Sequence, residues 1–218
     1  MSSEYDVEPV AGLPALPPRG EHVLWRGAPD ARSVALRAFH LRGIAIYFGV
    51  LAVWRVMGIL YDGGSLADAA AAVATFAVLA AGALSLLALI AWGVARTTVY
   101  TITNRRVVMR IGIALPVTFN LPYTQIDGAA LRPYEDGTGD IPLQLRDGTR
   151  LAYFVLWPHA RPWRFSRPEP MLRAVPNAAA TAQLLSEALA ASLTGPQAGA
   201  VSSSAPAAPL GRPALAAG

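Results

Sequence analysis

The chain has 218 residues, of which 54% are hydrophobic, and its formal net charge is +4. It contains no cysteine, which excludes disulfide bonds, thiolate metal sites and cysteine nucleophiles. All 18 basic residues are arginine, and many of them flank long apolar segments. This modest, localised positive charge suits anionic lipid headgroups and argues against nucleic acid as a partner.

The first 42 residues lead up to the apolar part of the chain. Residues 1–20 are acidic and then Pro-rich, which predicts a disordered N-terminal segment. Residues 21–42 predict a cytoplasmic strand, over residues 21–29, and an interfacial helix, over residues 31–42. We expect this helix to lie on the membrane surface, where its arginines at positions 32, 37 and 42 reach headgroups.

Residues 43–94 predict a transmembrane hairpin. Its two spans, residues 43–61 and 69–94, are long enough to cross a hydrocarbon core. A pair of buried helices in a soluble domain is disfavoured, because the second span has no polar face. Arginines precede the first span and follow the second, whereas the turn between them has none, so the positive-inside rule places both termini in the cytoplasm.

Beyond the hairpin the hydrophobic pattern takes a period of two, which is typical of strands. An antiparallel sheet is predicted from runs at residues 97–103, 106–114, 117–121, 125–131, 140–146 and 149–157. Asp147 and Gly148 are a strong signal for the turn of the last hairpin.

The C-terminal part predicts a loop, a helix and a tail. Residues 158–176 are too proline-rich for a helix, residues 178–193 have an amphipathic pattern, and residues 195–218 predict a disordered tail. We therefore expect residues 97–194 to form a cytoplasmic PH-like domain. The predicted fold is an α+β membrane protein with a two-helix transmembrane hairpin and a PH-like antiparallel β-sandwich or barrel, closed by a C-terminal helix.

The sequence offers no catalytic constellation. The three histidines, His22, His40 and His159, lack the spacing of a metal site, and no serine lies in a nucleophile elbow. We therefore expect a protein without enzymatic activity, cofactor or metal.

Seven residues are candidates for contact with a partner protein or with lipid: Arg55, Trp157, His159, Arg161, Trp163, Arg164 and Arg167. Arg55 lies inside the first span, where a charge commonly marks a function. It either snorkels to the far interface or pairs with an acidic group, from a partner helix or from Asp62 or Asp68. The other six form an aromatic-basic run, which is either a solvated cover over the sheet or, as we favour, an interaction surface for protein or lipid.

Several segments carry a resemblance to known families. EHVLWRG at residues 21–27 and YTITNRRVV at residues 100–108 resemble the membrane-linked bacterial PH-domain families. Further segments narrow the resemblance to PuhB-type photosynthetic-complex assembly proteins of purple phototrophic bacteria; they lie at residues 8–14, 37–40, 137–143, 157–164 and 170–176.

The resemblance implies a non-enzymatic assembly factor that tethers subunits of the photosynthetic reaction centre and the light-harvesting 1 antenna at the inner, or intracytoplasmic, membrane. A membrane-lipid-sensing or signalling PH-like protein is the alternative, and a homodimer is a candidate working unit. In this setting His40 could ligate the magnesium of a bacteriochlorophyll, but we favour an anchor among lipid headgroups.

The arginine asymmetry generates a test of topology. Reporter fusions at Ser65 and at Gly195 are expected to place the turn of the hairpin outside the cytoplasm and the tail inside it. Alkaline phosphatase and green fluorescent protein activities measure the two locations. Finding both sites on the same side would contradict the hairpin.

Overall fold

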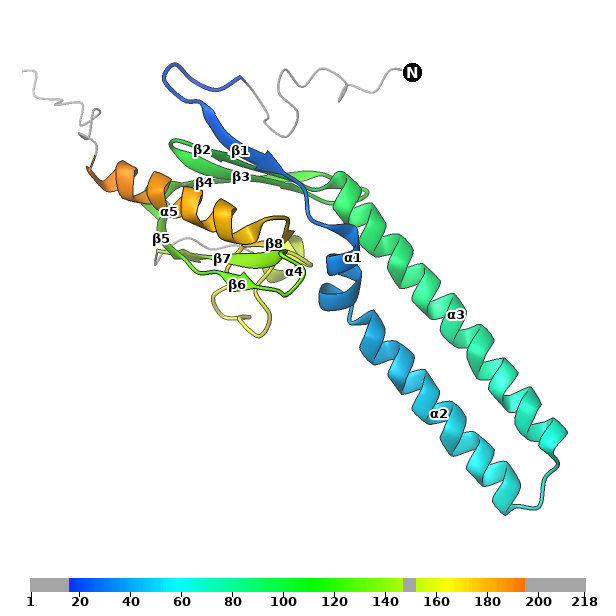
Figure 1. Cartoon of the computed structure of the whole chain (residues 1–218). Coiled ribbons are helices and arrows are strands. Elements are labelled where there is room, and N and C mark those ends of the chain that lie inside the picture. Colours follow the sequence, from blue (N-terminus) through cyan, green and yellow to red (C-terminus); the bar gives the residue numbers. More distant parts are fainter. Residues whose placement is uncertain (1–15, 147–151, 195–218) are drawn as a thin grey trace, which may run out of the picture.

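The computed structural model describes residues 16–146 and 152–194. Figure 1 shows a domain of two sheets and a long helix, from which a two-helix hairpin projects. The predictions for residues 1–15, for the tail at 195–218 and for the turn at Asp147 and Gly148 lie outside the described residues.

The hairpin consists of α2 (Leu41–Tyr61) and α3 (Leu66–Thr97), both long and apolar enough to cross a membrane. At 1.5 Å per residue, α2 is about 32 Å long and matches a hydrocarbon core, whereas α3 is about 48 Å long. The last turns of α3 therefore continue beyond the level at which α2 begins, and they pack against the domain (Figure 1).

Local chemistry defines the turn of the hairpin. Gly63 has a positive φ of 77°, which favours glycine, and a Cβ on Gly64 would lie 2.8 Å from the carbonyl oxygen of Ile59. Ser65 and Asp68 then form a capping box, in which each side chain accepts a hydrogen bond from the backbone N–H of the other residue. Helix α3 begins at this cap.

The strands form two antiparallel sheets. The first has the order β1 (Val23–Gly27), β2 (Val99–Thr103), β3 (Arg106–Ile111) and β4 (Val117–Pro122). A short 3₁₀ turn, η2 (Tyr123–Gln125), leads to the second sheet, in which β7 (Gly139–Leu145) pairs with β5 (Ile126–Ala129), β6 (Arg132–Pro133) and β8 (Met171–Val175). Among the described strands no pairing joins the sheets, so the α+β class is confirmed but a closed barrel is not formed.

One predicted strand beyond β7 is wrong. Within the run at 149–157, Tyr153–Leu156 forms a single helical turn, α4. The final strand is instead β8, within residues 158–176, for which the sequence predicted no strand. Its backbone pairs with one edge of β7. A local sequence pattern cannot predict this pairing, because the two strands are separated by the aromatic-basic segment.

The main hydrophobic core of the domain lies between the two sheets and α5 (Ala178–Thr194). Tyr100 and Met109 enter it from the first sheet, Ile141 and Leu143 enter it from the second, and all four are fully buried. Helix α5 covers this core with Leu185, which is also fully buried, so the predicted C-terminal helix closes the domain.

The first strand belongs to the domain although it precedes the hairpin. Strand β1 pairs with β2, and next to it Glu21 accepts two hydrogen bonds from the guanidinium of Arg106, at 2.7 and 3.0 Å. His22 and Asn104 add a backbone-to-side-chain bond of 3.0 Å. The domain therefore includes residues on both sides of the hairpin and is not confined to the predicted 97–194.

The segment between β1 and α2 differs from the expected surface helix. It contains α1 (Ala31–Ser33) and a π-helical stretch, η1 (Val34–Ala38), and it breaks at His40, whose φ is 52°. Val34 is fully buried in a cluster with Ala91 and Val94 of α3. The segment is therefore a packed joint between hairpin and domain rather than a helix lying free on a membrane surface.

A buried histidine ties the loop after α4 to β2. His159 is 1% exposed, and its Nδ1 lies 2.6 Å from the hydroxyl of Tyr100, while its Nε2 lies 3.2 Å from the hydroxyl of Thr98. The Tyr100 hydroxyl also accepts a bond from the backbone N–H of Arg173, so it is free to donate to Nδ1. Burial, with the nearby Arg173 charge, lowers the pKa of His159 to about 3.

This pKa predicts an acid-sensitive fold. The unfolded chain binds a proton at His159 below about pH 6.5 and the folded chain does not, so the stability that neutral His159 contributes is full above that pH and is lost progressively as the pH falls toward 3. We expect the thermal midpoint of the full chain in neutral detergent to drop between pH 6.5 and 4. The drop should be smaller in His159→Gln, which keeps a donor and an acceptor; equal slopes would contradict this role.

Candidate functional site

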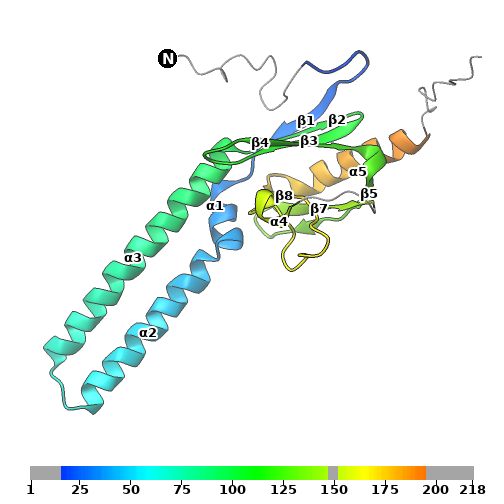
Figure 2. The same cartoon turned by 180° about the vertical axis from the view of Figure 1, so that it is seen from behind.

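Most of the candidate contact residues lie on one loop. Residues 157–170, which we call the aromatic-basic loop, join α4 to β8 on the side of the domain toward which the hairpin runs (Figures 1 and 2). Trp157 opens the loop and packs edge-to-face on Phe39 with ring centroids 5.6 Å apart. Since Phe39 lies two residues before α2, the loop is held beside the start of the hairpin.

Two arginines of the loop share one carboxylate. Arg161 pairs with Glu169 at 2.8 Å, and Arg164 lies 3.7 Å from the same carboxylate. The Glu169 side chain is only 13% exposed, whereas those of Arg161 and Arg164 are 37% and 52% exposed. The ion pairs brace the loop and still leave both guanidinium groups accessible. Arg167 lies exposed on the same loop.

The structure adds aromatic residues that our sequence prediction missed. Tyr153 contacts Phe165 at a centroid distance of 4.7 Å, and Phe165 contacts Trp163 at 6.4 Å; we call these three residues with Phe154 the aromatic cluster. Phe154 is 89% exposed and Trp163 is 87% exposed. The high aromatic content of residues 153–165 could have indicated this cluster. The assignment of residues 149–157 to a strand separated Tyr153 and Phe154 from the rest of it.

One of the seven candidates is not on the surface. His159 is buried in the bonds to Tyr100 and Thr98, so its selection as a contact residue was wrong. Its place in an aromatic-basic run gave no indication of burial, and its neighbours Pro158 and Ala160 are buried as well. His159 instead positions the aromatic-basic loop.

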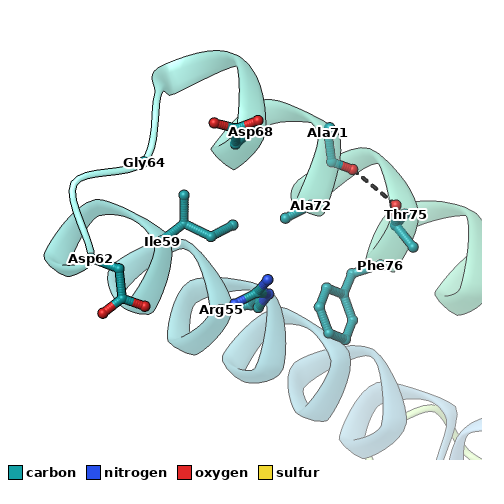
Figure 3. A pocket seen from close by; sticks show the side chains of 9 residues that line it. All are labelled: Arg55, Ile59, Asp62, Gly64, Asp68, Ala71, Ala72, Thr75 and Phe76. Atoms are coloured by element: carbon teal, nitrogen blue, oxygen red, sulfur yellow. Dashed lines mark hydrogen bonds between the residues drawn. The ribbon is translucent and has the colours of Figure 1, made fainter.

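Arg55 lies far from the loop, near the turn of the hairpin. Figure 3 shows it on the side of α2 that faces α3, at a cavity of about 600 Å³ that Phe76 and Thr75 also line. Within the described residues it has no ion pair, and Asp68 is occupied by the cap, where it accepts a 2.6 Å bond from the Ser65 hydroxyl. Pairing with Asp62 or Asp68 is therefore not formed, which leaves snorkelling or a partner's acidic group.

His40 is exposed at the break before α2. Residues 16–146 and 152–194 contain no group of three or more histidine, aspartate, glutamate or cysteine side chains that could hold a metal. The exposed features of the site are thus aromatic rings and guanidinium groups, which can bind a partner surface or a lipid headgroup.

The chain is similar in sequence to one described protein over most of its length. The chain is 42% identical over 195 residues to an uncharacterized 23.7 kDa protein in the puhA 5′ region of Rhodobacter capsulatus, and the match covers 89% of this chain and 91% of that protein. No solved structure matches.

A family model described as bacterial PH domain matches residues 34–189. This match begins in the joint before α2 and ends within α5, so it includes the hairpin as well as most of the two sheets. The chain therefore belongs to the bacterial PH domain family.

Proposed function

We propose that the protein is a non-enzymatic assembly factor for the photosynthetic reaction centre and its light-harvesting 1 antenna, acting at the inner, intracytoplasmic membrane. The observation that carries the proposal is the exposed aromatic cluster beside the start of α2. Contiguous exposed apolar side chains mark interaction sites, and aromatic residues contribute most to interface energy.

The joint between hairpin and domain supports this role. Ser33 of the joint bonds to Thr138 through their hydroxyls at 2.9 Å, and Arg37 pairs with Asp136 at 3.5 Å. A hairpin that crosses the bilayer would therefore hold the aromatic cluster at a fixed height and confine the domain to two dimensions. Confinement raises the effective concentration of the domain near newly inserted subunits without any chemical step.

The relationships of the chain support the photosynthetic setting. The description of the Rhodobacter capsulatus protein places it in the puhA 5′ region, and the motifs of this sequence resemble those of PuhB-type proteins. The two resemblance segments at residues 21–27 and 100–108 lie in the neighbouring strands β1, β2 and β3, so they belong to the framework of the domain.

The alternative function is lipid sensing without a photosynthetic partner. The arginines of the aromatic-basic loop and the joint favour it, because clustered guanidinium groups near a bilayer attract anionic headgroups. The two functions differ in whether subunits of the core complex co-purify with the protein.

Deleting the gene in its phototrophic host tests the proposal. We expect less assembled core complex, measured by its near-infrared absorbance, at unchanged transcript levels of the core subunits. Restoring the gene on a plasmid is the control. Normal core absorbance in the deletion strain would contradict an assembly function.

A double substitution, Phe154→Ser with Phe165→Ser, tests the docking surface. These side chains are 89% and 61% exposed, so stability should change by no more than about 0.5 kcal/mol each. We expect co-purification of antenna and reaction-centre subunits to fall about tenfold, because interface aromatics commonly contribute more than 1 kcal/mol each. The matched control is Leu193→Ser, 76% exposed at the far end of α5. Equal retention by the double variant and the control would place docking elsewhere.

A further inference from the structure

A cleft of about 650 Å³ lies between the joint, the second sheet and the aromatic-basic loop. Its size falls within the usual range for small-molecule sites. Leu36 and His40 line it from the joint, Pro142 and Met171 from β7 and β8, and Trp163 from the loop. Three segments that are distant in sequence therefore build it.

Four arginines line this cleft: Arg37, Arg132, Arg161 and Arg173. Arg37 lies over the ring of Tyr134 at 3.7 Å, and its ion pair with Asp136 is long, at 3.5 Å. Arg132 has no carboxylate partner in the part of the chain that the structure describes. Asp140 is the sole acidic residue of the described lining, so the cleft has an excess of positive charge.

Arg173 leaves hydrogen-bonding capacity unused at the wall of the cleft. Its Nη1 donates to the carbonyl of Pro158 at 2.8 Å, but its buried Nε has no acceptor among the described residues. Asp140 lies 3.9 Å away and already accepts bonds from the Tyr134 hydroxyl and the Ala174 N–H, at 2.6 and 2.8 Å. A buried donor without an acceptor is unfavourable, so Asp140 only partly compensates the Arg173 charge at the wall of the cleft.

The rim of the cleft is apolar and adjoins the hairpin. Leu36 is 42% exposed, Leu131 is 38% exposed and Trp163 is 87% exposed. Helix α2 begins at the next residue after His40, and its outer surface continues with exposed side chains such as Ile46 and Tyr47. A ligand with an anionic head and hydrocarbon tails complements both the arginines of the cleft and its apolar rim. An acidic peptide complements the arginines alone.

We propose that this cleft binds the phosphate of an anionic phospholipid, with Arg132, Arg161 and Arg173 around the phosphate and the acyl chains along α2. The proposal does not rest on the assembly function, although Trp163 belongs to both the cleft and the aromatic cluster, and lipid binding can be measured on the purified protein alone. The arginines favour an anionic headgroup over a zwitterionic one, since a choline cation beside them would be repelled.

Thermal unfolding of the full chain in neutral detergent tests this site. The probes are dioctanoyl phosphatidylglycerol, dioctanoyl phosphatidylcholine and inorganic phosphate. We expect phosphatidylglycerol to raise the midpoint saturably, with an apparent Kd about tenfold below those of the other two probes. Replacing Arg132→Gln and Arg161→Gln together should weaken phosphatidylglycerol binding about tenfold or more, because charge-assisted hydrogen bonds to phosphate are the strong ones.

The matched control is Arg146→Gln, which removes the same charge from an exposed arginine paired only with exposed Asp127 among the described residues. It should bind phosphatidylglycerol as the parent does. If the double variant fails to fold, Arg132→Gln alone should still weaken binding about threefold.

Four results would overturn the proposal. Equal loss in the Arg146→Gln control would show nonspecific charge attraction. Equal affinity for the two lipids would show that the acyl chains, and not the arginines, drive binding. Inorganic phosphate binding as tightly as phosphatidylglycerol would make the occupant a soluble anion. Unchanged lipid binding in the double variant, together with lost co-purification of core subunits, would make the cleft a protein-docking site.

Discussion

The antiparallel pairing of β1 with β2 is the constraint on which the rest of the structure depends. These strands flank the hairpin in sequence, and the Glu21–Arg106 ion pair joins residues 85 positions apart. The Glu21 side chain is only 3% exposed, so water cannot take the place of Arg106 as the partner of its charge. Because the chain must return to the same sheet after the hairpin, both ends of the hairpin meet at the domain.

A second set of contacts fixes the angle between hairpin and domain. Val34 and Phe39 pack on the last turns of α3, and the buried Ala174 of β8 joins this cluster. The backbone N–H of Asp30 donates to the carbonyl of Ala174 at 2.8 Å, so the joint is also bonded to the second sheet. A pair of helices joined to a domain by two flexible linkers would leave the domain free to swing, whereas this packed joint gives the aromatic-basic loop a defined place.

The aromatic-basic loop has a buried anchor, His159, and an exposed tip. His159 anchors it through Tyr100 and Thr98, and the Glu169 carboxylate braces Arg161 and Arg164. Held in this way, the loop can keep Trp163 exposed without collapsing onto the core. Ordering a surface before a partner arrives lowers the entropic cost of binding, whether the partner is a protein or a lipid.

The sequence by itself determined the two apolar helices, most strands of the first sheet and α5, because each is specified by a local period of hydrophobic residues. It also identified the aromatic-basic run from residue types alone. Only the tertiary structure decided that His159 is buried, that Tyr153–Leu156 is helical and that β8 completes the second sheet. The cleft with its four arginines could not be predicted either, since its lining comes from separate segments. Such features depend on contacts between residues distant in the chain, and a local pattern holds no information about which distant segments will meet.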